Sequence, residues 1–228
     1  MLIWGHRGAK GEYAANTINA MHDALRQGVD GLEFDVRLTR DCIPVVIHDN
    51  TLLLTRGINR SVSNLTHNEL KKISKDIPIP TLQEVLDEFW GKTYLNIELK
   101  STGSGEVVAT LLGSRYTKSA KDWQNCLISS FKIKELRQVR HTAPHARLAL
   151  LHNRTPFTFI LYQRSLKFAG LGFHRHYTSL LALTIARKLG IFTYAYTVNK
   201  PGGAKLLRDK KIDAVVTDYP RRIIDALQ

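Results

Sequence analysis

The sequence has 228 residues, of which 43% are hydrophobic and 23% charged, with 15 glycines and 7 prolines. This composition excludes a disordered or collagen-like chain and fits one large globular domain or two small ones. No run approaches the roughly 18 consecutive apolar residues of a membrane-spanning helix, so we expect no stable membrane insertion. No cleavable signal segment precedes His6, which favours a cytoplasmic protein.

Lysine and arginine outnumber aspartate and glutamate by 33 to 20, which gives a formal net charge of +13. Such an excess attracts nucleic acid, an anionic membrane or a small anionic substrate, and charge alone does not choose among them. The basic residues are scattered along the chain and do not belong to a recognised nucleic-acid-binding motif. We therefore interpret them as a solvated basic surface and expect no nucleic-acid partner.

Short apolar segments alternate with helical segments along the whole chain. The expected strands are 2–5, 32–38, 45–47, 95–99, 127–129, 148–151, 171–173, 192–196 and 214–216. The expected crossover helices include 16–25, 81–89, 179–189 and 201–210. Thr81 and Glu84 have the spacing of a capping box, which predicts where one helix starts. Strands and helices that alternate in this way indicate a parallel sheet.

The gap between the second and third strands is too short for a crossover helix, so these strands should form an antiparallel hairpin. Its turn would be Thr39-Arg40-Asp41-Cys42. The remaining eight strands predict a (β/α)8 TIM barrel, with a doubly wound open sheet as the alternative; no Gly-rich dinucleotide turn or phosphate-loop motif supports the latter. We interpret 1–228 as a single domain in which residues 50–80 form a small insertion over the barrel mouth.

Two expected strands carry charged side chains on one face. Apolar and charged residues alternate in 31–38, so Glu33 and Asp35 share a face. In the strand at 95–99, Asn96, Glu98 and the following Lys100 share a face in the same way. Barrel strands are normally covered on both sides and consist of apolar runs. We therefore expect these polar side chains to point toward the barrel axis.

Three carboxylates that converge in a partly dry mouth would raise one another's pKa values unless a cation held them ionised. A single divalent ion bound by Glu33, Asp35 and Glu98 is the simplest solution, and all-oxygen ligands favour Mg²⁺ or Ca²⁺ over zinc. The remaining negative charge would be offset by Arg7 and Lys100, so a phosphodiester anion could enter. The alternative is that the carboxylates form structural salt bridges with Arg37, Lys100 or Arg7.

His6 follows the first strand and His48 ends the hairpin return, so both should lie at the carboxyl-terminal rim, where barrel active sites form. A two-residue turn at Arg40 and Asp41 would place Glu33 opposite His48 on the same face. Two imidazoles beside a metal-bound anion suit hydrolysis, in which one removes a proton from the nucleophile and the other protonates the leaving oxygen.

The other histidines have no such context. We expect surface positions for a first group, namely His22, His67, His141, His145 and His152. His174 and His176 follow a strand, which leaves a place at the rim open for them.

An ordered set of short motifs extends nearly from end to end of the chain. It comprises His6-Arg7-Gly8, Asn16-Thr17, Glu33-Phe34-Asp35, Val45-Val46-Ile47-His48-Asp49, Pro80-Thr81-Leu82, Asn96-Ile97-Glu98-Leu99-Lys100, Ser129-Ser130-Phe131, Tyr196-Thr197-Val198-Asn199 and Thr217-Asp218. Each motif alone is weak, but the ordered set is specific. With it, the chain resembles the glycerophosphodiester phosphodiesterases of the small bacterial cytoplasmic type.

The resemblance implies hydrolysis of a small glycerophosphodiester to sn-glycerol 3-phosphate and an alcohol. It implies one divalent cation, Mg²⁺ or Ca²⁺, bound by the three carboxylates, with His6 and His48 as general acid and base. Arg7 and Lys100 would hold the phosphate, and Tyr196 would line the glycerol pocket. The identity of the alcohol, the order in which the histidines act and a homodimer all stay open.

Two positions depart from the family pattern. Ala15 stands where the family usually has a glutamate before Asn-Thr, which removes a carboxylate from the rim, and Glu12 is a candidate substitute. Cys42 stands where the hairpin turn usually has glycine, at a cost of about 1 kcal/mol if the residue is left-handed. A lysophospholipase D-type phosphodiesterase and a catalytically weakened relative that only binds phosphodiesters are the alternative functions.

Overall fold

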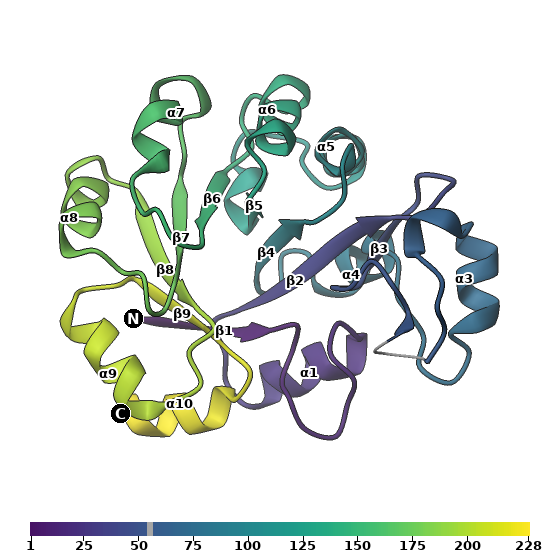
Figure 1. Cartoon of the computed structure of the whole chain (residues 1–228), viewed down its shortest axis with the longest axis horizontal. Coiled ribbons are helices and arrows are strands. Elements are labelled where there is room, and N and C mark those ends of the chain that lie inside the picture. The colour runs from purple at the N-terminus through teal and green to yellow at the C-terminus, as the bar shows by residue number, and fades with distance from the viewer. Residues whose placement is uncertain (54–56) are drawn as a thin grey trace.

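The computed structural model describes residues 1–53 and 57–228 and shows a ring of strands surrounded by helices (Figure 1). The strands are β1 (Leu2–His6), β2 (Gly31–Leu38), β3 (Pro44–Val46), β4 (Tyr94–Leu99), β5 (Cys126–Ser130), β6 (Leu148–His152), β7 (Gly170–His174), β8 (Phe192–Tyr196) and β9 (Ala214–Thr217). The helices are α1 (Ile18–Arg26), α3 (His67–Ile73), α4 (Leu82–Phe89), α5 (Ser104–Arg115), α6 (Ile133–Thr142), α7 (Thr158–Leu166), α8 (Leu180–Lys188), α9 (Pro201–Asp209) and α10 (Pro220–Leu227), with 3-10 helices at Val62–Asn64 and Asp122–Asn125.

The sheet is closed. β1 pairs in parallel with both β2 and β9, and the parallel order continues from β2 through β4, β5, β6, β7 and β8 to β9. These eight strands form the expected (β/α)8 barrel, and β3 pairs antiparallel with the outer end of β2. The prediction is confirmed, and the open doubly wound alternative is wrong. All parallel strands therefore end at one rim.

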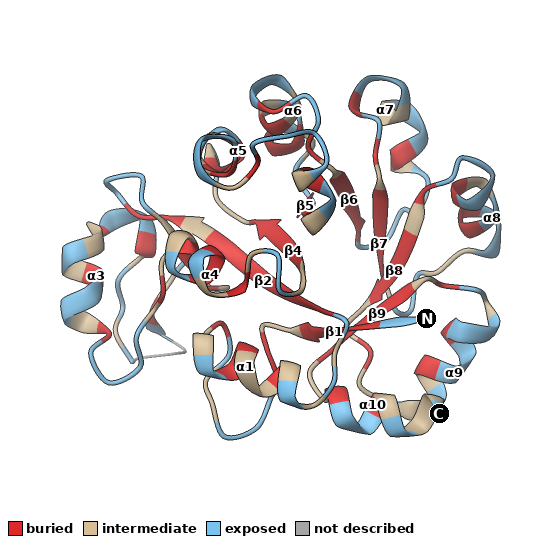
Figure 2. Ribbon diagram, turned by 180° about the vertical axis from the view of Figure 1, so that it is seen from behind, coloured by how far each residue is buried: buried red, intermediate tan, exposed pale blue. Residues whose placement is uncertain are grey.

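The helices bury apolar residues against the outside of the barrel. Leu32, Phe34 and Val36 of β2 are fully buried in this layer, and Figure 2 shows buried residues along the strands. Burial of one such side chain contributes roughly 1.5 to 3 kcal/mol. The capping box that opens α4 is present: the Thr81 hydroxyl accepts from the Glu84 backbone N–H, and the Glu84 carboxylate accepts from the Thr81 backbone N–H.

Aromatic rings fill the amino-terminal part of the barrel interior. The ring of Trp4 lies 5.4 Å from that of Tyr94, 5.5 Å from Phe192 and 5.2 Å from Tyr194, between ring centroids. Side chains two residues apart on a strand share a face. His6 therefore lies on the same inward face as Trp4, one step closer to the carboxyl-terminal rim.

The β2–β3 hairpin has a longer loop than expected. Leu38 pairs with Pro44, and the Thr39 backbone N–H donates to the Ile43 carbonyl, so three residues rather than two lie between the strands. Cys42 ends this loop with a left-handed φ of 59°. Three-residue hairpin loops commonly end in a left-handed residue, which explains why glycine suits this position.

The longer loop shifts the hairpin register by one residue. The Ile47 backbone N–H donates to the Asp35 carbonyl, so the expected pairing of Glu33 with His48 is wrong. β3 ends at Val46, and His48 follows it outside the ladder. Turn geometry sets the register of a hairpin, and a single extra loop residue changes every pair.

Residues 50–53 and 57–80, the described part of the expected insertion, contain the first 3-10 helix and α3 and lie beyond the outer end of β2 (Figure 1). A small core, separate from the main one, joins Val45 and Ile47 to residues of this segment, namely Leu52, Val62, Leu65 and Leu70. The interpretation of 1–228 as one domain, with this segment as an insertion over the mouth, stays a prediction. Within the described residues, no helix has the length and apolar character needed to cross a membrane.

Candidate active site

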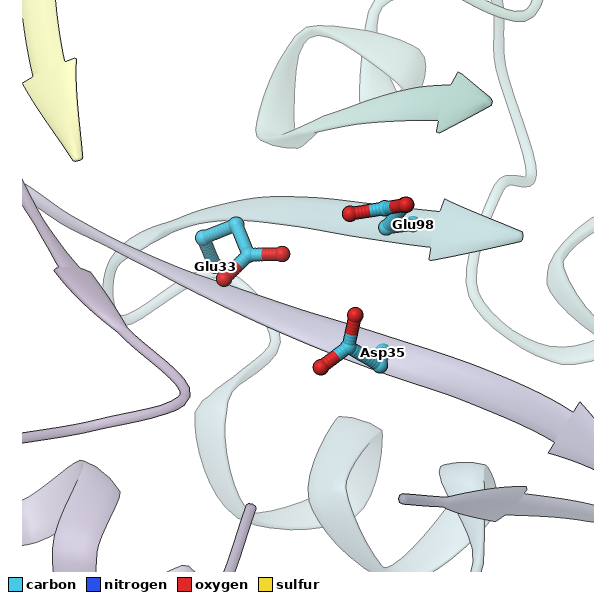
Figure 3. A group of neighbouring side chains, drawn as sticks. All are labelled: Glu33, Asp35 and Glu98. Carbon is cyan, nitrogen blue, oxygen red and sulfur yellow. The ribbon is translucent and has the colours of Figure 1, made fainter. Parts of the chain in front are cut away.

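The three expected carboxylates converge at the carboxyl ends of two adjacent strands. Asp35 of β2 pairs in register with Glu98 of β4, and Glu33 lies one inward position earlier on β2. One carboxylate oxygen from each lies within 4.8 Å of the others, and all three residues are buried. Figure 3 shows the side chains directed into the same space. The predicted convergence is confirmed.

Burial makes this group electrostatically costly. It raises the pKa of Glu33 well above its ordinary value, and repulsion from Asp35 and Glu98 raises it further. Burial also raises the pKa of Glu98 to about 7, with repulsion from Asp35 adding to the rise. Lys100 opposes both rises. The site therefore favours an additional positive charge close to the carboxylates.

Asp35 is the best-compensated member of the group. Burial alone would raise its pKa, but Lys100 and Arg7 outweigh burial and hold the pKa below its ordinary value. Arg7 Nε lies 2.9 Å from Asp35 Oδ2, and Lys100 Nζ lies 3.2 Å from Asp35 Oδ1 and 2.5 Å from Glu98 Oε1. Two of the three expected salt-bridge partners are thus present, whereas Arg37 donates to the His48 carbonyl.

Left-handed backbone positions bring Arg7 and Asn16 to Asp35. Arg7 has φ 57° and Asn16 has φ 62°, and the Asn16 side-chain amide donates to Asp35 Oδ2 at 3.0 Å. Gly8 between them has φ 93°, and a Cβ there would lie 2.4 Å from the Ala20 backbone, so only glycine fits. Non-glycine residues with positive φ are uncommon and are often found at functional sites.

The departure at Ala15 leaves an exposed position next to Asn16. Glu12, the candidate substitute, is also exposed and lines a separate cavity with the start of α1, residues 76–78 and Pro80. Neither residue belongs to the buried carboxylate group.

His6 is held by Asp218, a residue of the Thr217-Asp218 motif for which the sequence predicted no role. His6 Nδ1 lies 2.5 Å from Asp218 Oδ1, and His6 Nε2 lies 3.8 Å from Glu33 Oε2. The Asn199 side-chain amide donates to Asp218 Oδ2 at 2.5 Å, and the Asp218 backbone N–H donates back to Asn199 Oδ1 at 3.0 Å. Burial alone would raise the pKa of Asp218, but the hydrogen bond to His6 lowers it below its ordinary value.

The sequence did contain a signal for this residue. Asp218 directly follows Thr217, the last residue of β9, and β9 is paired with the strand that carries His6. A carboxylate at the carboxyl end of a barrel strand is a typical active-site position.

His48 is held by its neighbour in sequence. His48 Nδ1 lies 2.6 Å from Asp49 Oδ1, and the side chain is 36% exposed. Partial burial lowers the pKa of His48 below its ordinary value, although the Asp35 charge opposes this effect. Both expected rim histidines thus have one ring nitrogen next to a carboxylate, which fixes the ring orientation.

Tyr196 lies at the same rim. With His6, Glu33 and Glu98 it lines one small cavity of about 20 Å³ in the barrel centre, and its hydroxyl donates to the His152 carbonyl at 2.8 Å. Of the expected site residues, His6, Arg7, Glu33, Asp35, Glu98, Lys100 and Tyr196 are therefore in one neighbourhood, with His48 close enough for Asp35 to affect its pKa.

Two other histidines, His152 and His174, end the neighbouring strands β6 and β7. His152 is buried, and its expected surface position is wrong: the ring stacks on Phe173 at 5.1 Å and meets Phe159 edge-on at 5.9 Å. On β6, His152 lies on the apolar face that is directed outward from the barrel. Packing beneath α7 therefore sets its environment. His174 lies at the rim, with its ring 6.2 Å from that of Tyr196.

The carboxylate group fits a hard divalent cation. Glu33 Oε2 is buried without a hydrogen-bond partner, since His6 Nε2 at 3.8 Å is too far away. Three carboxylates offer the all-oxygen donor set that Mg²⁺ and Ca²⁺ prefer. A buried group of this kind could hold such an ion, which would relieve the repulsion that raises two of the three pKa values.

Comparison with known proteins gives consistent matches. The model of the glycerophosphoryl diester phosphodiesterase family matches residues 6–222. A glycerophosphodiester phosphodiesterase of Caldanaerobacter subterraneus is 30% identical over 242 residues, which cover 100% of this chain and 98% of that protein. One from Bacillus altitudinis is 28% identical over 97% of this chain and 96% of the relative.

Solved structures agree in fold. An Oleispira antarctica phosphodiesterase, in complex with the product sn-glycerol-3-phosphate, superposes with a TM-score of 0.85 at 26% identity, covering 100% of this chain and 96% of the other. A glycerophosphodiester phosphodiesterase of Thermotoga maritima gives a TM-score of 0.85 at 26% identity, with coverages of 100% and 98%. The family match spans nearly the whole length and the barrel agrees, so the chain belongs to the glycerophosphoryl diester phosphodiesterase family.

Proposed function

We propose that this protein hydrolyses glycerophosphodiesters to sn-glycerol 3-phosphate and an alcohol, with the aid of one divalent cation. The observation that carries the proposal is the group of Glu33, Asp35 and Glu98, buried at the barrel mouth with His6 beside it. The relative that was solved with sn-glycerol-3-phosphate supports the same substrate class.

Arg7 and Lys100 are the proposed phosphate-binding residues. Both lie against Asp35, so their positive charges are held at the site by carboxylates. Arginine and lysine form charge-assisted hydrogen bonds with phosphate oxygens. A phosphodiester that enters would share these cations with the carboxylates. Tyr196 lines the same cavity and would contact the glycerol portion.

His6 and His48 are the proposed general acid and base. One imidazole removes a proton from the attacking water as the water oxygen bonds to phosphorus. The other gives a proton to the alcohol oxygen as its bond to phosphorus breaks. Asp218 orients His6 and Asp49 orients His48, in each case through the Nδ1 atom of the histidine. The second ring nitrogen of each histidine is thereby left for proton transfer.

Glu33, Asp35 and Glu98 are the proposed ligands of the cation. A bound Mg²⁺ or Ca²⁺ would polarise the phosphate oxygens and stabilise the charge that develops on them. The protein contributes the fixed positions of the carboxylates, because two come from one strand and the third from its hydrogen-bonded neighbour.

An assay of glycerol 3-phosphate release from glycerophosphocholine and glycerophosphoethanolamine tests the proposal. We expect activity that is lost in chelator and restored by Mg²⁺ or Ca²⁺. Asp35→Asn should reduce it strongly, whereas Asp76→Asn, outside the carboxylate group, is the matched control. Full activity in chelator would exclude the metal role, and absence of product with every substrate and metal would leave a binding protein.

A further inference from the structure

The net positive charge belongs to the second half of the chain. Residues 1–122 carry equal numbers of acidic and basic side chains, so the whole formal charge of +13 comes from 123–228. From Trp123 to Arg208, fourteen lysines and arginines occur with a single acidic residue, Glu135. Glu135 is buried and accepts hydrogen bonds from the Gly103 and Gly105 backbone N–H groups. The surface from β5 to α8 is therefore basic without exposed acidic side chains of its own.

Exposed apolar side chains gather on two neighbouring helix starts in this half. Phe157, Ile160, Leu161, Tyr177, Leu180 and Leu181 form what we name the rim patch, and all six are exposed. They follow β6 and β7, at the carboxyl-terminal rim of the barrel. Helices α7 and α8 are neighbours around the barrel in both views (Figures 1 and 2).

Two leucines of the patch have large exposed fractions. Leu161 is 78% exposed and Leu181 62%. Single exposed leucines are normal on protein surfaces, and Leu189 at the other end of α8 is one such case, with 52% exposed. The six residues of the patch differ from such single cases, because they follow two hydrogen-bonded neighbouring strands at one rim, and apolar side chains grouped in this way mark a site of interaction.

Cations accompany the patch. Arg154 precedes Phe157 on the β6–α7 connection, and Arg175 precedes Tyr177 on the β7–α8 connection; both arginines are exposed. Lys132 occupies the equivalent place after β5, beside exposed Phe131. Three successive connections at one rim thus present a cation next to a large apolar side chain.

The patch borders the active site. The ring of Tyr177, a member of the patch, lies 5.6 Å from that of His174, and the His174 ring lies 6.2 Å from that of Tyr196. A surface that contacts the rim patch would therefore lie next to the entrance through which substrate reaches the carboxylates.

We propose that the rim patch docks this protein on the surface of a membrane that contains anionic lipid. The leucines and aromatic rings insert at the boundary between head groups and acyl chains, and the arginines lie among anionic head groups. A nucleic acid would use the charge but give no role to the leucines. The proposal rests on the proposed function only in placing lipid-derived phosphodiesters at the active site.

Co-sedimentation of the 228-residue chain with vesicles tests the docking. Phosphatidylglycerol mixed into phosphatidylcholine should increase the bound fraction at least about fivefold over phosphatidylcholine alone, the effect of roughly one cation near the surface. Added salt should reverse the gain by screening. No binding to the anionic vesicles at low salt would overturn the proposal.

Matched variants identify the surface. The double variant Leu161→Ser, Leu181→Ser should bind anionic vesicles at least about tenfold more weakly, because two apolar side chains no longer insert. Leu189→Ser, similarly exposed at the other end of α8, should bind like the original protein. Equal losses in both variants, or unchanged binding in the double variant, would contradict docking through the patch. Retention on a DNA duplex that equals vesicle binding and is unaffected by these substitutions would also contradict it.

A parallel assay separates this proposal from the proposed function. Hydrolysis of water-soluble glycerophosphocholine should be unchanged in the double variant, since its leucines lie outside the active site. Vesicle binding without hydrolysis of any phosphodiester would leave docking intact and refute the proposed function. Hydrolysis without vesicle binding would refute the docking and leave the proposed function intact.

Discussion

The two halves of the barrel have different electrostatic characters. Residues 1–122 supply the three buried carboxylates and both rim histidines, yet their formal charges cancel. Residues 123–228 supply one residue of the histidine–carboxylate pairs, Asp218, and carry the entire net charge.

This contrast shows that net charge and active-site charge are separate properties of the chain. The carboxylates are buried, so their charges are compensated over a few ångströms by Arg7 and Lys100. The basic surface acts over longer distances through water and is screened by salt. Substitutions of the buried active-site charges should therefore change turnover, and those of the basic surface should change association.

The largest expected effect is the loss of turnover when a rim histidine is replaced. Its absence would contradict the contrast between the two halves of the barrel. His6→Ala and His48→Ala should each lower kcat about 100-fold to 10,000-fold, because each removes one proton-transfer group. Steady-state assays of glycerol 3-phosphate release measure this, and His145→Ala, an exposed histidine of the second half, is the control. Turnover unchanged in both rim variants would refute the assigned roles.

Asp218 belongs to the second half but holds a rim histidine of the first half, so a variant at this position tests how far the two halves differ in their effect on turnover. Asp218→Asn should lower kcat about 10-fold to 100-fold with little change in KM, because His6 loses its orienting carboxylate. The same substitution in a His6→Ala background should have no further effect. An additive loss in the double variant would show that Asp218 acts independently of His6. Asp225→Asn, an exposed residue of α10, is the control.

His152 should affect stability and not turnover. Burial disfavours the charged ring and lowers its pKa to about 4, against about 6.5 for an unfolded histidine. As pH falls below 6.5 the unfolded chain takes up the proton first, so the free energy of unfolding falls until about pH 4, by about 3 kcal/mol from this residue. Above pH 6.5 its contribution is constant.

Thermal unfolding between pH 7 and pH 4 measures this effect. His152→Phe should show a smaller loss of stability over that range than the original protein, and exposed His145→Ala should show the same loss as the original. Parallel pH profiles for His152→Phe and the original protein would mean that other groups cause the acid sensitivity.

The smallest expected effect lies in the first half, away from the active site. Cys42→Gly should raise the free energy of unfolding by about 1 kcal/mol, because glycine adopts a φ of 59° without steric cost. Cys42→Ala keeps the Cβ and should change stability little. Denaturant titration distinguishes the two, and equal stability of both variants would mean that the left-handed position is not strained.

Periodicity in the sequence predicted most of the fold. The alternation of short apolar runs with amphipathic segments indicated the closed parallel barrel, and the Thr81 capping box marked the start of α4. Alternation inside one strand put Glu33 and Asp35 on the inner face, since side chains on a strand repeat every two residues. These features depend on residues close in sequence, and local chemistry determines them.

Other features of the site required the tertiary structure. The register of the β2–β3 hairpin depends on a three-residue loop in which Cys42 is left-handed. The same sequence is also compatible with a two-residue loop, so it did not decide the register. The burial of His152 depends on where Phe159 and Phe173 lie.

The sequence by itself determined the barrel, its inward carboxylates and the pair of rim histidines. Only the tertiary structure decided that Asp218 holds His6, 212 positions away along the chain, and that leucines of α7 and α8 remain exposed. The physical reason is that strand periodicity is a short-range property of the backbone. Closure of the barrel, in contrast, joins β1 to β9 through contacts that no local pattern records.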